Sequence, residues 1–144
     1  MSTAPTFSTQ LIGQTEKTLN AILGRLLAGT GLSEPQWVTL TVAVMSGSSI
    51  ERGAFVSRIA GALRISEGEA QARIDELAAE RLFEVDDSAV TVTDAGKELQ
   101  ARIRGEVVEI TDRMWGDLPA DDLAAAGRVL TTVLERASAE LSRA

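Results

Sequence analysis

The chain has 144 residues, of which 44% are hydrophobic and 3% aromatic, and its formal net charge is −7. It contains no cysteine and no histidine, which excludes disulfides, thiolate or imidazole catalysis and the usual zinc ligand sets. This composition suits a single domain, residues 1–144, with an aliphatic and mainly helical core, and its acidity does not suggest an electrostatic partner such as nucleic acid or anionic lipid.

The first part of the chain predicts two helices. Apolar residues recur at helical spacing over about residues 8–29, and Gly29-Thr30-Gly31 ends this pattern. Ser33-Glu34-Pro35-Gln36 then has the form of a capping box, with a proline in the first turn. The second helix is expected to run to Met45, before the break at Ser46-Gly47-Ser48-Ser49.

The middle of the chain predicts a winged helix-turn-helix over about residues 33–92. Arg52–Leu63 is a short amphipathic helix, and Ser66 to Glu69 forms a second capping box that opens a helix to about Glu80. Two β-prone runs follow, Leu82–Val85 and Ala89–Val92. They predict a small hairpin, and a hairpin directly after a helix-turn-helix is a wing.

The end of the chain predicts two more helices, separated at Leu118-Pro119. These helices, within residues 93–142, and the first one, within residues 8–29, carry apolar stripes too long for so small a domain to cover. A two-fold homodimer is the most economical way to bury them. The expected fold class is therefore mainly α, with dimerisation helices from both termini.

The ordered set of motifs resembles the MarR family of transcriptional regulators over nearly the whole chain. The resemblance is carried by Thr30 to Trp37, by the block from Ile59 to Leu82, by Val92-Thr93-Asp94-Ala95-Gly96 and by the break from Leu118 to Leu123. It implies a homodimer that places one recognition helix in each half-site of palindromic duplex DNA. It also implies a small ligand, often phenolic, between the dimer helices and the winged helix.

The residues expected to contact DNA lie on and just before the predicted recognition helix. Arginines are the phosphate contacts and Gln71 is the one good base reader, because an amide can pair with adenine. The set is Arg52, Arg58, Arg64, Ser66, Gln71 and Arg73.

This surface departs from the family in its charge. The outward positions of the recognition helix include Glu67, Asp75 and Glu76, and the predicted wing tip is Asp86-Asp87-Ser88. From Arg64 to Asp94 there are three arginines against nine aspartates and glutamates, a net charge of −6. Phosphate neutralisation supplies most non-specific DNA affinity, so we expect weak binding with a shallow salt dependence.

The two tryptophans, Trp37 and Trp115, have two interpretations. They pack in the core, or they line a pocket for a small aromatic ligand with Thr41, Phe55 and Ile59 as neighbours. The resemblance places both tryptophans near the ligand site of the family.

Other kinds of function find little support. The pairs Asp86-Asp87 and Asp121-Asp122 fall at a turn and a helix start, where carboxylates are ordinarily solvated rather than catalytic. We expect no enzyme, no catalytic residue, no metal and no cofactor. No apolar run suits a bilayer and the first ten residues do not form a secretory signal, so we expect a cytoplasmic protein without membrane contact.

Two functions remain open. The first is a ligand-responsive regulator that binds duplex DNA. The alternative is a dimer of the same fold with weak or no DNA binding, acting as a small-molecule-binding or protein-binding module.

Overall fold

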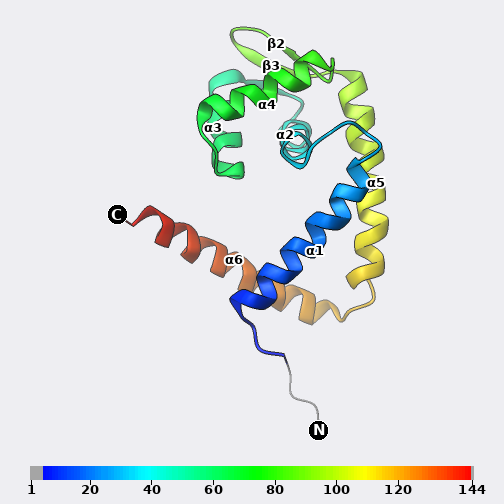
Figure 1. The fold of residues 1–144 in the computed structure, drawn as a ribbon, viewed down its shortest axis with the longest axis vertical. Coiled ribbons are helices and arrows are strands. Elements are labelled where there is room, and N and C mark those ends of the chain that lie inside the picture. Colours follow the sequence, from blue (N-terminus) through cyan, green and yellow to red (C-terminus); the bar gives the residue numbers. More distant parts are fainter. Residues whose placement is uncertain (1–4, 144) are drawn as a thin grey trace. The chain divides into compact units, whose positions relative to one another are not determined.

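The structure is a computed structural model that describes residues 5–143 (Figure 1). Along these residues the order of elements is α1 (Thr9–Leu27), α2 (Glu34–Met45), β1 (Ser49–Glu51), α3 (Arg52–Leu63), α4 (Glu67–Ala79), β2 (Phe83–Val85), β3 (Ala89–Val92), α5 (Asp94–Trp115) and α6 (Ala120–Ser142). The predicted mainly helical winged-helix fold is confirmed. Residues 1–4, the first part of the segment considered as a secretory signal, lie outside the described residues.

The chain divides into two compact units, the first ending at Val107 and the second beginning at Val108. The core of the first unit is formed by α2, α3, α4 and the small sheet, with Ile103 of α5. Its fully buried side chains are aliphatic except for Thr39 and for Phe55, whose ring meets that of Phe83 edge-on at 6.0 Å. Full burial of such a side chain contributes about 1.5–3 kcal/mol, so this cluster holds the winged helix together.

Side-chain caps begin the helices where the sequence predicted them. Ser33 Oγ accepts a hydrogen bond from the Gln36 N–H at 3.3 Å, and the Gln36 side chain accepts one from the Ser33 N–H at 2.9 Å. This pair completes the capping box of α2. At the start of α4, Ser66 Oγ accepts from the Glu69 N–H at 3.1 Å. Arg64 ends α3 in a left-handed conformation (φ 58°), which allows the tight turn between α3 and α4.

The sheet has three strands, where the sequence predicted a two-stranded hairpin. Strand β3 lies in the middle and pairs antiparallel with both neighbours, with Ile50 of β1 opposite Val90 and Phe83 of β2 opposite Val92. The sequence did not reveal β1 because its three residues follow a serine-rich break and are too few to show an alternating pattern. Its pairing with β3, far along the chain, creates the strand.

The start of α5 is fixed against the residues that precede β2. Thr93 Oγ1 donates to the carbonyl oxygens of Arg81 at 2.8 Å and Leu82 at 3.1 Å, and it accepts from the Gly96 N–H at 3.1 Å. Gly96 is buried, and a Cβ on it would overlap the Leu82 carbonyl oxygen. The Val92-to-Gly96 motif therefore fixes the start of α5 against the residues that lead into the wing.

Several helices keep apolar side chains in solvent. In α6 no described residue is buried, and its exposed large side chains include Val129, Leu130, Leu134 and Leu141. In α1 the buried residue is Leu27, at the C-terminal end, while Leu11 is exposed. No helix within residues 5–143 is long and apolar enough to cross a membrane.

Candidate nucleic-acid interface

Helix α4 presents one face to the core and one to solvent. Ala70, Ile74 and Leu77 are fully buried, as the sequence predicted. On the outward side Glu67 and Asp75 are exposed, and Gln71, Arg73 and Glu76 are half-buried. The predicted reading face, the outward side of α4 that would contact DNA, is thus present. Its side chains are hydrogen-bonded to one another and to α2 and α3.

Arg73 is paired with a carboxylate of its own helix. Its Nη2 lies 2.9 Å from Glu76 Oε2, and the two side chains are 30% and 42% exposed. The other oxygen of the same carboxylate, Glu76 Oε1, accepts a hydrogen bond from Gln36 Nε2 of α2 at 2.9 Å. Arg73 Nε is buried and has no hydrogen-bond partner among residues 5–143. The guanidinium is therefore held by Glu76 but only partly satisfied.

Gln71 is also engaged. Its Oε1 accepts from Arg52 Nε at 3.3 Å, and its Nε2 donates to Asp75 Oδ1 at 2.9 Å. Arg52 stands at the start of α3, so this chain of bonds links α3 to α4. The predicted base reader and a predicted phosphate contact are thus turned toward each other.

The remaining residues predicted to contact DNA are Arg58, Arg64 and Ser66. Arg58 is exposed, and its Nη1 donates to Ser46 Oγ at 2.8 Å. Arg64 is exposed at the turn between α3 and α4. Ser66 is used as the cap of α4, and it also donates to the Glu69 carboxylate at 3.2 Å. Glu67, the next residue, accepts from Ser57 Oγ of α3 at 2.8 Å.

The wing tip is short and acidic, as predicted. Asp86 Oδ1 accepts hydrogen bonds from the Ser88 N–H at 2.8 Å, the Ala89 N–H at 2.8 Å and the Ser88 hydroxyl at 2.9 Å. These bonds hold the pKa of the Asp86 carboxyl below its usual range, and the two backbone N–H groups contribute most to the shift. Asp86 therefore builds the turn, and Asp87 beside it is exposed.

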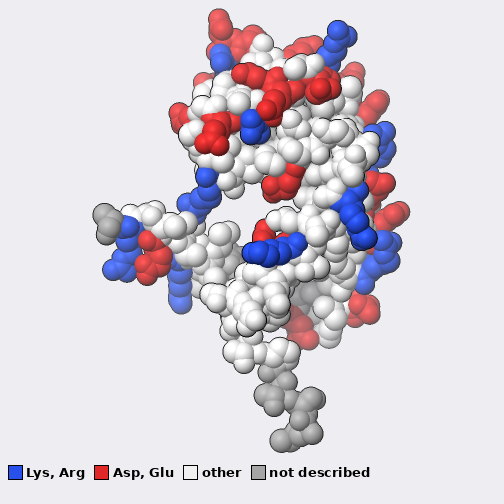
Figure 2. Space-filling view, in the orientation of Figure 1, with Lys and Arg blue, Asp and Glu red and all other residues white. Residues whose placement is uncertain are grey.

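The surface charge agrees with the sequence count. Figure 2 shows acidic side chains gathered over the upper part of the first unit, where Figure 1 places α4 and the hairpin. Lys and Arg side chains are also present there, both at its edges and among the acidic side chains. A DNA phosphate approaching this face would meet carboxylates as well as arginines.

The residues predicted to bind a ligand occupy different environments. Trp37, Phe55 and Ile59 belong to the buried core cluster. Thr41 is half-buried, and its hydroxyl oxygen is enclosed without a hydrogen-bond partner among the described residues. Trp115 belongs to the second unit and is 41% exposed.

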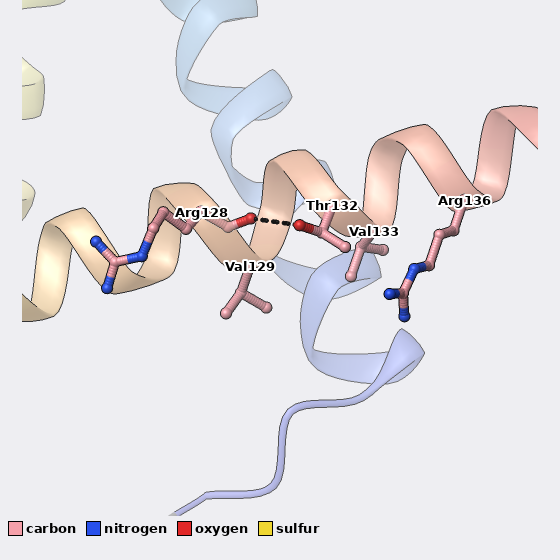
Figure 3. A pocket seen from close by; sticks show the side chains of 5 residues that line it. All are labelled: Arg128, Val129, Thr132, Val133 and Arg136. Carbon is pink, nitrogen blue, oxygen red and sulfur yellow. Dashed lines mark hydrogen bonds between the residues drawn. The ribbon is translucent and has the colours of Figure 1, made fainter.

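A shallow, open depression of about 280 Å³ follows one side of α6. Figure 3 shows the Arg128 side chain running along the helix away from the other four residues and the Arg136 side chain reaching down beside Val133, with Val129, Thr132 and Val133 between the two arginines. Thr132 Oγ1 donates to the Arg128 carbonyl oxygen at 3.0 Å and is thus already used. Within residues 5–143 no group of three or more carboxylates is arranged to hold a metal ion.

The bonds that connect α4 to its neighbours could not be predicted from the sequence. Gln36 and Glu76 are 40 residues apart, and Gln36 was assigned to the cap of α2, where it also acts. The signal available was the spacing of Arg73 and Glu76, because opposite charges three residues apart on a helix favour an ion pair.

Known structures resemble this fold closely, although neither a protein-family model nor a curated protein sequence matches the chain. A MarR-family transcriptional regulator from Silicibacter pomeroyi superposes with a TM-score of 0.75 at 20% identity, covering 90% of this chain and 88% of the other. BpsR of Bordetella bronchiseptica, whose DNA binding is described as regulated by 6-hydroxynicotinic acid, gives 0.69 at 20% identity, with 91% and 97% covered.

CouR of Rhodococcus jostii RHA1, solved bound to p-coumaroyl-CoA, gives a TM-score of 0.72 at 15% identity, with 85% of this chain and 88% of the other covered. The order of elements, the three-stranded sheet and these superpositions all indicate the same fold. The chain has the winged-helix fold of the MarR-family transcriptional regulators.

Proposed function

We propose that this protein is a MarR-type transcriptional regulator of the cytoplasm, a homodimer that binds palindromic duplex DNA through α4 and responds to a small ligand. The observation that carries the proposal is the complete winged helix-turn-helix, with α3, α4 and the hairpin fixed by one core. Its structural neighbours are regulators, which favours this function over an enzyme.

The proposed DNA contacts are the arginines around α4, with Gln71 as the base reader and Ser66 at the start of the helix. Arg58 and Arg64 are exposed, and Arg52 and Arg73 are half-buried and must leave Gln71 and Glu76 to reach DNA. Each neutralised phosphate adds about 0.9 to the slope of log affinity against log salt. Electrophoretic mobility shifts with the DNA upstream of the protein's own gene, across a salt series, test this part of the proposal.

The proposed dimer uses α1, α5 and α6. The support is their uncovered apolar surface, since Leu11, Val108, Leu130 and Leu134 are all at least 43% exposed in the single chain. Exposed apolar area of this extent is typical of an interface. Leu130→Asp should produce a monomer or an unfolded chain, because a buried unpaired carboxylate is costly.

Thr132→Asp is the matched control for the dimer. Thr132 is exposed on the same helix and lies about 200° further around it than Leu130, away from the apolar stripe. Light scattering should show a dimer for the wild type and for this control. A monomeric wild type at micromolar concentration would contradict the dimer.

The proposed ligand is a small aromatic acid. The support comes from neighbours solved or described with aromatic acids or their thioesters and from the enclosed, unpartnered hydroxyl of Thr41 four residues after Trp37. Phe55 and Ile59 belong to the same core cluster as Trp37 and complete the proposed lining, and the assignment of Trp115 to the ligand site stays a prediction from the sequence. Salicylate should quench tryptophan fluorescence saturably, and Trp37→Phe should reduce that quenching.

A second function is favoured by one observation, the acidic face around α4 and the hairpin (Figure 2). In this alternative the dimer binds a small molecule or a protein and has little or no affinity for DNA. The two functions are separated by duplex binding at low salt, where electrostatic affinity is greatest.

A further inference from the structure

The charged groups of the reading face are paired with one another. We propose that Glu76, together with Asp75, is a built-in competitor of DNA phosphate, which holds Arg73, Gln71 and Arg52 in a self-paired state. We call the two sets of bonds, Gln36–Glu76–Arg73 and Arg52–Gln71–Asp75, the carboxylate latch. The inference rests on the proposed function, because it assumes that α4 faces DNA.

The first half of the latch is centred on Glu76. Its two carboxylate oxygens are used separately, one by Arg73 Nη2 and one by Gln36 Nε2, each at 2.9 Å. Gln36 is in turn fixed by its capping role at the start of α2. The Glu76 side chain is therefore positioned from two sides, and it presents to Arg73 the same charge-assisted acceptor that a phosphate would.

The second half is centred on Asp75. It accepts from the Gln71 amide at 2.9 Å, and the carbonyl oxygen of that amide accepts from Arg52 Nε at 3.3 Å. Both polar ends of Gln71 are thus occupied. An adenine edge needs the same amide donor and acceptor, so base reading requires Gln71 to leave both partners.

The ion pair between Arg73 and Glu76 can be broken at little cost. Arg73 and Glu76 are 30% and 42% exposed, and ion pairs that reach solvent in this way are weak. In the closed state the buried Nε–H of Arg73 has no acceptor within the described residues. Once the Arg73 side chain turns outward, a phosphate that accepts from both Nε and Nη2 would satisfy this donor, which Glu76 leaves unsatisfied. DNA binding then involves an exchange of one anion for another around Arg73.

The latch makes a prediction that simple repulsion between acidic side chains and DNA does not make. Neutralising any carboxylate near DNA raises affinity, but neutralising Glu76 also frees Arg73 to make a new phosphate contact. A new contact steepens the salt dependence by about 0.9 per subunit. For each freed arginine, the gain in affinity is about 3.5-fold larger at ~50 mM than at ~200 mM salt.

The test compares Glu76→Gln with Glu80→Gln by fluorescence anisotropy on a fluorescein-labelled duplex of mixed sequence. Both variants remove one charge from the same helix region. The Glu80 side chain makes no hydrogen bond or ion pair within residues 5–143, so it serves as the matched control. The amide in Glu76→Gln can still accept from Gln36, which preserves the tie to α2. We expect a steeper slope for Glu76→Gln and an unchanged slope for Glu80→Gln.

A second pair of variants does not depend on the folding of Glu76→Gln. Arg73→Gln should reduce the affinity of the otherwise wild-type protein less than Arg58→Gln does. Among the described residues Arg58 donates to the neutral hydroxyl of Ser46, which competes poorly with phosphate. In a chain that also carries Glu76→Gln, the loss caused by Arg73→Gln should become larger.

The outcomes separate the latch from the proposed function. If the wild type binds the duplex, and Glu76→Gln and Glu80→Gln raise affinity equally with equal slopes, the latch is wrong and the function stands. An Arg73→Gln loss equal to that of Arg58→Gln also overturns the latch. If the wild type and every variant fail to bind at ~50 mM salt, the latch and the proposed DNA binding are both overturned.

Discussion

The substitution Gly96→Ala tests how α5 is attached to the winged helix. A Cβ at this position would overlap the Leu82 carbonyl oxygen and lie 2.8 Å from Val92 Cγ1. The neighbour that must move is backbone, and its carbonyl also accepts from the Thr93 N–H at 3.0 Å. Gly96→Ala therefore forces the first turn of α5 away from the chain before β2 and loosens the Thr93 cap.

The expected loss is worked from these contacts. Overpacking a well-filled site costs about 1–3 kcal/mol, and loss of a cap costs about 0.5–2 kcal/mol. The greater helix propensity of alanine returns up to about 1 kcal/mol. Together these terms lower the free energy of unfolding of Gly96→Ala by about 0.5–5 kcal/mol, and each kcal/mol lowers Tm by about 2–4 °C.

Gly105→Ala is the matched control on the same helix. A Cβ on Gly105 meets no atom within 4 Å, so the substitution should leave stability unchanged or raise it by up to about 1 kcal/mol. Urea denaturation at one fixed protein concentration measures both variants, because the stability of a dimer depends on concentration. The packing described for α5 would be refuted if Gly96→Ala proved as stable as Gly105→Ala.

Three further predictions follow from hydrogen bonds at the ends of elements. Thr93→Val keeps the shape of the side chain and removes all three of its bonds, so it should lower the free energy of unfolding by about 1–2 kcal/mol in urea melts, and Thr93→Ser should recover most of the loss. Ser33→Ala breaks the capping box and should cost about 0.5–2 kcal/mol, whereas Ser142→Ala, at the exposed end of α6, should leave the unfolding curve unchanged. The folded pKa of Asp86 is depressed, so the stability it contributes is fully present above its ordinary value of 3.8 and is lost as pH falls through the folded pKa. Asp86→Ala should therefore be less stable than wild type at neutral pH, and unfolding curves that fail to converge in acid would contradict this assignment.

Much of the fold could be predicted because its signals are local. Ser33 with Gln36, and Ser66 with Glu69, marked the starts of α2 and α4, and the caps form there. The inner face of α4 followed from the spacing of Ala70, Ile74 and Leu77. Strand β1 could not be predicted, since its structure depends on pairing with β3 rather than on its own three residues.

The candidate site was predictable in its charge but not in its pairing. The excess of acidic residues around α4 was countable in the sequence. The partners of those residues were not, because Gln36–Glu76, Arg52–Gln71 and Ser57–Glu67 join different helices. Such contacts depend on the tertiary packing of α2 and α3 against α4, which periodicity along one helix does not describe.

Selection of duplexes from a random pool by the purified protein at low salt is the most direct test of the central claim, that this winged helix binds DNA as a two-fold dimer. The salt is held near 50 mM, where electrostatic affinity is greatest. We predict enrichment of a palindromic sequence whose half-sites are about one helical turn apart. Recovery of an unenriched pool under these conditions, from a protein shown to be folded, would contradict the claim.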